Sequence, residues 1–189
     1  MKLICVHEAD DADVTFYLRP DTALLRNNDS FYYPEFTEHI TARVCVIFRV
    51  CRLGRSIGER FAARYYDAVG AGMTFTAADL LARHTAQGKP WGNAVAFDYS
   101  TAVSREFLPI AAWDGNLAAH VCGTPPQPIA LDMQGTQRLP QIIARISAFM
   151  TLKIGDYIFI PASAPFPIQC GNLIETFFGD RKMMEVAVK

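Results

Sequence analysis

Apolar and polar positions alternate most clearly over residues 41–52, TARVCVIFRVCR. Successive side chains of a strand point to opposite faces of a sheet, so this alternation predicts a strand. One face carries Val44, Val46, Phe48 and Val50, and we expect it to lie in the core. The other face carries Arg43, Cys45, Ile47, Arg49 and Cys51. Such a mixed face is typical of a strand that borders a polar cleft or solvent.

Shorter apolar runs predict further strands at residues 3–6, 15–18 and 157–160. Two more runs, at 173–178 and 183–188, flank Gly179-Asp180 and predict a hairpin. The sequence lacks the regular alternation of strands and helices that parallel βαβ units require. It therefore predicts an α+β fold with a β-rich, largely antiparallel sheet and about three helices.

The first of these helices is predicted to begin at Ser56. Ser56 and Glu59 have the spacing of a capping box, in which the two side chains satisfy backbone N–H groups at a helix start. Apolar residues follow at helical spacing: Ile57, Phe61, Tyr65 and Val69. Gly70 and Gly72 then predict the end of the helix.

Two other segments have helical signals. Thr76 and Asp79 form a second possible capping box, which opens a helix that Gly88-Lys89-Pro90 closes. The third helix is predicted to begin at Pro140, because proline is favoured at the first helical position, and to run to about Met150. Its inward-facing residues are expected to be Ile142, Ile143, Ile146 and Phe149.

The composition is that of one folded domain, which we expect to span residues 1–189. Of the 189 residues, 51% are hydrophobic and 20% are charged, and a chain of this length folds without a disulfide or metal. Eighteen Lys and Arg against 19 Asp and Glu give a net charge of −1. This balance lacks the positive field that nucleic acid or an anionic membrane would need. No apolar run approaches the ~20 residues of a membrane span.

The five cysteines form no Cys-x-x-Cys pair, and their number is odd. Because disulfides are rare in reducing compartments, we expect reduced thiols in a cytoplasmic protein. The four histidines are as scattered along the sequence as the cysteines. This scatter argues against a structural zinc site.

One acidic cluster, Glu8 to Asp13, stands near the start of the sequence. Its carboxylates at Glu8, Asp10, Asp11 and Asp13 are oxygen ligands of the kind that bind a hard cation. The cluster lacks the mid-loop glycine and closing glutamate of an EF-hand. We therefore interpret it as a solvated loop.

Three basic side chains are candidates for a binding role. His39 precedes the 41–52 strand, but no carboxylate or nucleophile is tied to it by spacing, so a surface or capping position is expected. Arg43 and Arg49 lie on the mixed face of that strand. An arginine that points into a cleft binds anions, and one that points outward is solvated. The sequence leaves both possibilities open for this pair.

The common catalytic motifs Gly-x-Ser-x-Gly, P-loop, His-Glu-x-x-His and Gly-x-Gly-x-x-Gly are absent. Five stretches, however, together resemble the fumarylacetoacetate hydrolase family. They are FYLRPDTALL (16–25), RVCRLGRSI (49–57), GMTFTAADL (72–80), KPWGNAVAFD (89–98) and FMTLKIGDYIF (149–159). The resemblance implies a β-rich mixed-sheet roll or sandwich, usually assembled as a homodimer. It also implies hydrolysis, isomerisation or decarboxylation of 2-oxo or 1,3-dicarbonyl acids with one Mg²⁺ or Mn²⁺.

The sequence departs from the family pattern at the positions that carry this chemistry. Arg43 and Cys45 stand where the family has two metal-binding glutamates, and Thr74 stands at the position of an aspartate ligand. Val95 stands at the position of a substrate-binding lysine. The segment between Val6 and Phe16 is too short for the family loop that carries a catalytic histidine.

Two hypotheses follow from the resemblance and these departures. In the first, the chain has lost the divalent-metal site and the ancestral catalysis, and needs no cofactor. It persists as a structural partner in a homodimer, or in a heterodimer with an active paralogue. A variant of this hypothesis is that Arg43 binds a small carboxylate.

In the second hypothesis the chain is an active hydrolase, isomerase or decarboxylase. Its substrates would be acylpyruvates or 2-hydroxyhepta-2,4-diene-1,7-dioate, from aromatic or carboxylic acid catabolism. Metal would bind through Asp98 or the Glu8 to Asp13 cluster, and Thr74 or Cys45 would take new roles. A Cys45 nucleophile would need the field of Arg43 to lower its pKa.

Overall fold

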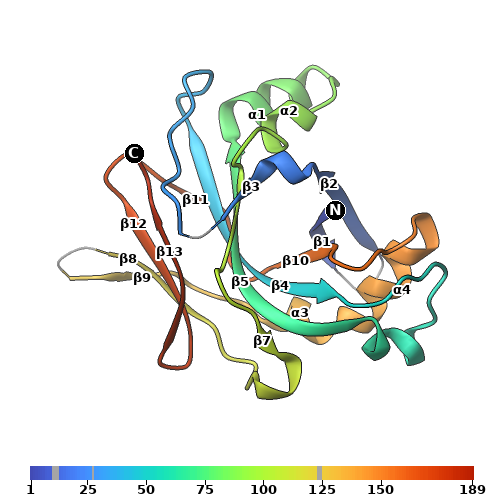
Figure 1. Cartoon of the computed structure of the whole chain (residues 1–189). Helices are drawn as coiled ribbons and strands as arrows, with labels where there is room; N and C mark the ends of the chain where they lie inside the picture. Colours follow the sequence, from blue (N-terminus) through green and yellow to red (C-terminus); the bar gives the residue numbers. More distant parts are fainter. Residues whose placement is uncertain (10–12, 27, 123–124) are drawn as a thin grey trace.

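Two β-sheets form the framework of the fold (Figure 1). The computed structural model describes residues 1–9, 13–26, 28–122 and 125–189. The larger sheet contains β1 (Leu3–Ala9), β2 (Val14–Arg19), β3 (Leu24–Leu25), β4 (Ile40–Val50), β5 (Tyr66–Ala77), β6 (Thr101–Val103), β7 (Leu108–Pro109), β10 (Tyr157–Pro161) and β11 (Phe166–Pro167). The smaller sheet contains β8 (Ala118–Val121), β9 (Gln127–Pro128), β12 (Leu173–Phe178) and β13 (Arg181–Ala187).

The larger sheet has the order β2-β1-β10-β4-β5-β6-β3, with β11 paired to β4 and β7 paired to β5. The smaller sheet has the order β13-β12-β8-β9. Among the described strands, β1 pairs in parallel with β10 and β3 with β6, and the other paired strands are antiparallel. The predicted α+β fold, its largely antiparallel sheet and the terminal hairpin are confirmed.

Helices cover part of the larger sheet (Figure 1). The α-helices within the described residues are α1 (Ala78–Ala86), α2 (Gly92–Val95), α3 (Gln134–Gln137) and α4 (Leu139–Phe149). Short 3₁₀ helices are η1 (Asp21–Ala23), η2 (Glu59–Arg64) and η3 (Ile110–Ala112). In the part of the chain that is described, no helix combines the length and the apolar character needed to span a membrane.

The prediction of a helix that begins at Ser56 is wrong. Ser56 has a positive φ of 50°, a backbone conformation that an α-helix does not contain. Only η2 is helical here, and the chain then enters β5, which runs through Gly70 and Gly72. A Cβ atom at Gly72 would lie 2.4 Å from Cδ1 of Ile47. The glycines therefore mark a close approach of β5 to its neighbours, as glycine does inside strands.

The helix predicted after Thr76 is confirmed as α1, but its capping box is wrong. Ala77 is the N-cap residue, and it makes no side-chain hydrogen bond to the helix. The carboxylate of Asp79 instead accepts hydrogen bonds from the Thr37 hydroxyl and from the backbone N–H of Glu38. Asp79 therefore ties the segment before β4 to the start of α1.

The predicted helix at Pro140 is confirmed as α4, with proline in its first turn. Ile142, Ile143 and Ile146 are fully buried, as expected. The inward orientation predicted for Phe149 is wrong, because Phe149 is 60% exposed. Its ring packs against that of Phe16 in a T-shaped arrangement, with 5.9 Å between ring centroids.

Both faces of β4 contribute to the core. The face with Val46 and Phe48 packs with α4, and Val44 belongs to the apolar cluster that the larger sheet shares with the smaller one. The opposite face is mixed only near its ends, since Cys45 and Ile47 are buried in a third cluster. The sheet is thus covered on both sides along the middle of β4, and an opening remains toward the start of that strand.

We expect Gly72→Val to lower the free energy of unfolding by about 1–3 kcal/mol, the usual cost of overpacking a core. The new side chain would collide with Ile47, which is itself fully buried. Chemical denaturation monitored by circular dichroism measures the change. Gly92→Ala is the matched control, because nothing lies within 4 Å of a Cβ at Gly92. Equal stabilities of the two variants would contradict the packing described for β5.

Candidate functional site

The candidate site lies where several strands of the larger sheet end at one edge. Because β4 is antiparallel to both β10 and β5, its first half lies beside the ends of those two strands. Pro161 at the end of β10 is opposite Cys45, and Arg43 is directly opposite Thr74 on β5. The loop after β10 crosses the same edge, where the Val44 N–H donates to the Ser163 hydroxyl at 3.0 Å.

Two adjoining pockets open at this edge, and both have His7 and Arg43 in their walls. We call the first the threonine pocket; it has a volume of about 440 Å³. Its lining residues include Tyr17, Thr41, Thr74, Thr76, Trp91 and Val95. We call the second the Arg138 pocket; it has a volume of about 570 Å³. Its lining residues include Asp132, Gln134, Arg138, Ile160, Pro161 and Ser163.

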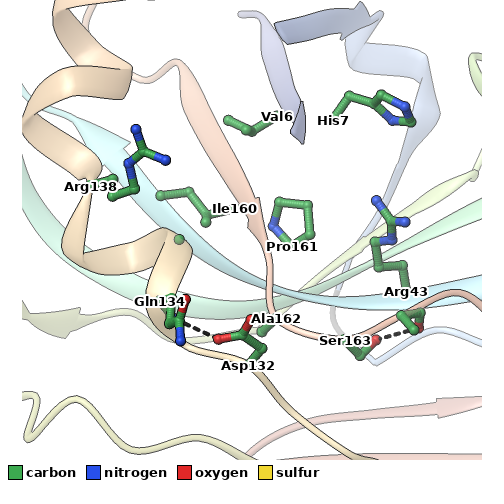
Figure 2. A pocket seen from close by; sticks show the side chains of 12 residues that line it. Val6, His7, Arg43, Asp132, Gln134, Arg138, Ile160, Pro161, Ala162 and Ser163 are labelled. Atoms are coloured by element: carbon green, nitrogen blue, oxygen red, sulfur yellow. Dashed lines mark hydrogen bonds between the residues drawn. The ribbon is translucent and has the colours of Figure 1, made fainter. Parts of the chain in front are cut away.

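Arg43 is the charged group at the junction of the two pockets. Figure 2 shows its side chain extending toward His7, with Arg138 beyond Ile160 and Pro161. Among the described residues, no side chain forms an ion pair or hydrogen bond with the Arg43 guanidinium. Arg49, the other arginine on this strand face, is bound in a bidentate ion pair by Asp67, at 3.0 and 2.9 Å. Arg43 therefore points into a cleft, and Arg49 is a neutralised surface group.

The threonine pocket surrounds Arg43 with hydroxyl groups. Thr74 lies directly opposite Arg43 across the β4–β5 pair, and Thr76 lies opposite Thr41. All four side chains line the pocket. Sequence reasoning identified Thr74 but missed Thr41 and Thr76; the available signal was that Thr41 shares a strand face with Arg43. The hydroxyls offer donors and acceptors beside the guanidinium.

A second arginine lies buried near the pocket. Arg19 is 1% exposed. Its Nη1 donates to the carbonyl oxygens of Phe75 at 2.9 Å and Ser100 at 2.5 Å. Its Nη2 donates at 3.2 Å to the hydroxyl of Tyr17, which lines the threonine pocket. No carboxylate in the described part of the chain pairs with Arg19, so its charge adds to the positive field of Arg43.

Cys45 does not belong to the cleft wall. It is 1% exposed and lies in the apolar cluster beneath Arg43. Burial, and to a smaller extent the neighbouring Cys5, raise the pKa of the Cys45 thiol to about 12, against a smaller lowering by Arg43. The suggestion that Arg43 activates Cys45 as a nucleophile is therefore wrong, because burial outweighs the field of the arginine.

The other sequence candidates are dispersed. Val95 lines the threonine pocket. Asp98 is exposed and lies in a separate pocket with Tyr99. His39 is exposed and lies outside the cleft, in the wall of a third pocket.

The acidic cluster near the start of the chain is described only in part. Asp13 forms an ion pair with Arg145 of α4, at 2.9 Å. Asp10 and Asp11 lie outside the described residues, as does the side chain of Glu8. The described part of the cluster is therefore an ion pair on the surface of α4.

The donor groups that the described residues bring to this cleft do not fit a Mg²⁺ or Mn²⁺ ion. Such ions take carboxylate and water oxygens in octahedral geometry. No described residue of the threonine pocket carries a carboxylate, and in the Arg138 pocket Asp132 is exposed and accepts from the Gln134 N–H. A dication placed about 4 Å from the Arg43 guanidinium would be repelled by a few kcal/mol even with strong screening.

The fold is shared with solved proteins related to fumarylacetoacetate hydrolase. A fumarylacetoacetate hydrolase family protein from Yersinia pestis matches with a TM-score of 0.86 at 20% identity, over 100% of this chain and 93% of its own. The fumarylpyruvate hydrolase from Pseudomonas aeruginosa, solved with Mn²⁺ and pyruvate, matches with a TM-score of 0.83 at 18% identity, over 100% of this chain and 89% of its own. A candidate fumarylpyruvate hydrolase from Burkholderia cenocepacia matches with a TM-score of 0.87 at 23% identity, over 100% of this chain and 88% of its own.

Solved isomerases of similar fold also match the chain. No protein-family model and no curated protein sequence matches the chain. At these sequence identities the likeness establishes the fold: the chain has the fold of the fumarylacetoacetate hydrolase proteins. The predicted roll of this type is confirmed.

We expect Cys45 to resist alkylation in the folded protein, because its thiol is buried and protonated at neutral pH. Treatment with iodoacetamide at pH 8, followed by peptide mass spectrometry, measures labelling at each cysteine. The exposed Cys170 is the internal reference and should be labelled quickly. Cys45 should react only after denaturation; labelling at the rate of Cys170 would refute its placement beneath the cleft.

Proposed function

We propose that the chain is a divergent member of the fumarylacetoacetate hydrolase family that binds a small carboxylate, without a metal ion, at Arg43. The ligand class is a 2-oxo or dicarboxylic acid anion of the size of pyruvate or oxalate. The protein then acts as a binding protein rather than as a hydrolase. As the family resemblance implies, we expect a homodimer, or a heterodimer with an active paralogue.

The observation that carries this proposal is the guanidinium of Arg43, which has no partner among the described residues and lies at the junction of both pockets. A guanidinium binds a carboxylate through two parallel N–H···O bonds, which fixes the orientation of the anion. A cation held in a cleft between low-dielectric walls also concentrates anions there. The arrangement favours an anionic ligand over any cationic one.

Two further features support a ligand with a second oxygen beside its carboxylate. Thr74 and Thr76 place hydroxyls next to Arg43, and a hydroxyl can donate to a carbonyl or second carboxylate oxygen. The buried charge of Arg19 lies behind Tyr17 and makes the pocket more positive. Trp91 and Val95 add apolar wall, which suits a short carbon chain.

The similarity to the Pseudomonas aeruginosa fumarylpyruvate hydrolase is consistent with this proposal. That protein holds both Mn²⁺ and pyruvate. In this chain we infer that the organic anion keeps its place and that the positive charge of Arg43 replaces that of the metal. A fixed cation neutralises a carboxylate but supplies no vacant coordination position to a developing enolate. Binding without catalysis follows.

Binding of oxalate and pyruvate tests the proposal directly. Isothermal titration calorimetry in EDTA should detect binding to the unmodified protein. Arg43→Gln should weaken it at least about 30-fold, because truncating one partner of a buried charge pair costs roughly 2–5 kcal/mol. Arg83→Gln, an exposed arginine on α1, is the control and should leave binding unchanged. Binding that needs Mg²⁺, or that survives Arg43→Gln, would overturn the proposal.

A second candidate function, retained hydrolysis without metal, is favoured by one observation. His7 lies in the wall of both pockets, beside the side of Arg43 that faces the cleft. A histidine within reach of a bound substrate is a possible general base. An acylpyruvate whose carboxylate binds Arg43 would then present its carbonyl carbon to water near His7.

Turnover measurements separate the two functions. If the chain only binds, acylpyruvate, fumarylpyruvate and oxaloacetate should react at the buffer rate, with or without Mg²⁺. Turnover above that rate, abolished by His7→Gln while oxalate binding persists, would establish the second function. Turnover that depends on Mg²⁺ would contradict both, since the described donor groups do not fit that ion.

A further inference from the structure

A cluster of three metal-ligand side chains lies on the smaller sheet, on β8 and β12. His120 belongs to β8, Cys122 follows that strand, and Glu175 on β12 is directly opposite His120. Because His120 and Cys122 are two residues apart in extended backbone, they point to the same face. The core-facing side of this sheet carries Ile174 and Met184. The three polar side chains therefore share the side that turns away from the core.

The ligand atoms of these side chains converge. The nitrogen of His120, the sulfur of Cys122 and a carboxylate oxygen of Glu175 all lie within 4.8 Å of one another. His120 Nε2 and Glu175 Oε2 are 2.9 Å apart. Ligands bonded to one Zn²⁺ at 2.0–2.3 Å are separated by about 3–4 Å in tetrahedral geometry. Rotations of side chains alone can therefore place all three around one ion.

The surroundings hold two of the three ligands in place. The imidazole of His120 stacks on the ring of Phe177, with 5.3 Å between centroids and 14° between planes. The backbone N–H of Cys122 donates to the Leu173 carbonyl at 2.7 Å, which extends the β8–β12 pairing to this cysteine. All three side chains are half-buried, so they are ordered by the sheet and remain accessible from solvent.

We propose that His120, Cys122 and Glu175 form a binding site for a transition-metal ion of the Zn²⁺ type. Imidazole nitrogen, thiolate sulfur and carboxylate oxygen are the ligands of Zn²⁺ in proteins, and a three-ligand site leaves one position for water. The charge balances as well. One thiolate and one carboxylate neutralise the dication. When the metal binds, the proton of the Cys122 thiol passes to solvent, and the proton between His120 Nε2 and Glu175 Oε2 is replaced by one on Nδ1 of the ring, so that the imidazole stays neutral.

Lys182 competes with the metal for Glu175. Its ammonium contacts Glu175 Oε1, and it also lies 2.9 Å from Glu185 Oε2. The other oxygen, Glu175 Oε2, faces His120 and is the one available to the metal. On metal binding, Lys182 keeps Glu185 as its partner. The ammonium weakens the site but does not block it.

Metal titration of the full chain tests this site. Co²⁺ should bind with one equivalent and give the visible absorption of a cobalt–thiolate bond, and Zn²⁺ should displace it. Since loss of outer-shell partners alone costs about 10–100-fold in metal affinity, Cys122→Ser and Glu175→Gln should each weaken Zn²⁺ binding at least about 100-fold. Zn²⁺ should also raise the melting temperature of the unmodified protein.

Two matched variants distinguish this site from adventitious binding to exposed thiols. Cys170→Ser removes an exposed cysteine elsewhere and should leave Zn²⁺ affinity unchanged. Lys182→Gln should tighten binding, because it removes the cation that competes for Glu175. The proposal is overturned if no stoichiometric binding occurs, or if Cys170→Ser abolishes it while Cys122→Ser does not. Oxalate binding at Arg43 is measured independently, so neither result depends on the other.

Discussion

The antiparallel pairing of β4 with β5 is the constraint on which the cleft depends. Its register places Arg43 opposite Thr74 and Thr41 opposite Thr76, so one strand face carries one cation and three hydroxyls. The next residue on the same face of β4, Cys45, is already in the core. Gly72, opposite Cys45, leaves space for Ile47. A shift of one residue would bury Arg43 and expose the apolar face, which the core does not tolerate.

Electrostatics then decides what this cleft accepts. In the described part of the chain, Arg19 is fully buried and Arg43 is partly buried, and neither has a carboxylate partner. Backbone carbonyls and the Tyr17 hydroxyl compensate Arg19. The Arg43 guanidinium pairs with no described side chain, although Thr41, Thr74 and Thr76 line the same pocket. An isolated guanidinium in a confined pocket favours an anion and repels a dication. One solved protein of the same fold is in complex with Mn²⁺ and pyruvate; for this chain we propose that the cleft binds an organic anion alone.

Four elements could be predicted because each has a strong local period or turn signal in the sequence. They are the strands of residues 41–52 and 157–160, the terminal hairpin and the helix at Pro140. The helix at Ser56 was predicted wrongly because apolar residues at helical spacing coincide with a capping-box pattern. Gly70 and Gly72 lie against side chains that are distant in sequence, so their role inside a strand could not be seen from the local pattern. Arg43, Thr74 and Val95 were located through the family resemblance. His7, Arg138 and Thr76 were not, because only the packing of segments distant in sequence brings them to one edge. The cluster of His120 and Cys122 with Glu175 was missed for the same reason.

The most direct test of whether the Arg43 guanidinium takes the place of a metal ion is a crystal structure. The crystals are grown with both oxalate and Mn²⁺, and anomalous scattering is recorded to locate the manganese. The account predicts oxalate within hydrogen-bonding distance of the Arg43 guanidinium and the Thr74 hydroxyl, with no anomalous peak in the threonine pocket or the Arg138 pocket. A manganese ion in octahedral coordination beside Arg43, or oxalate absent from the cleft at saturating concentration, would contradict it.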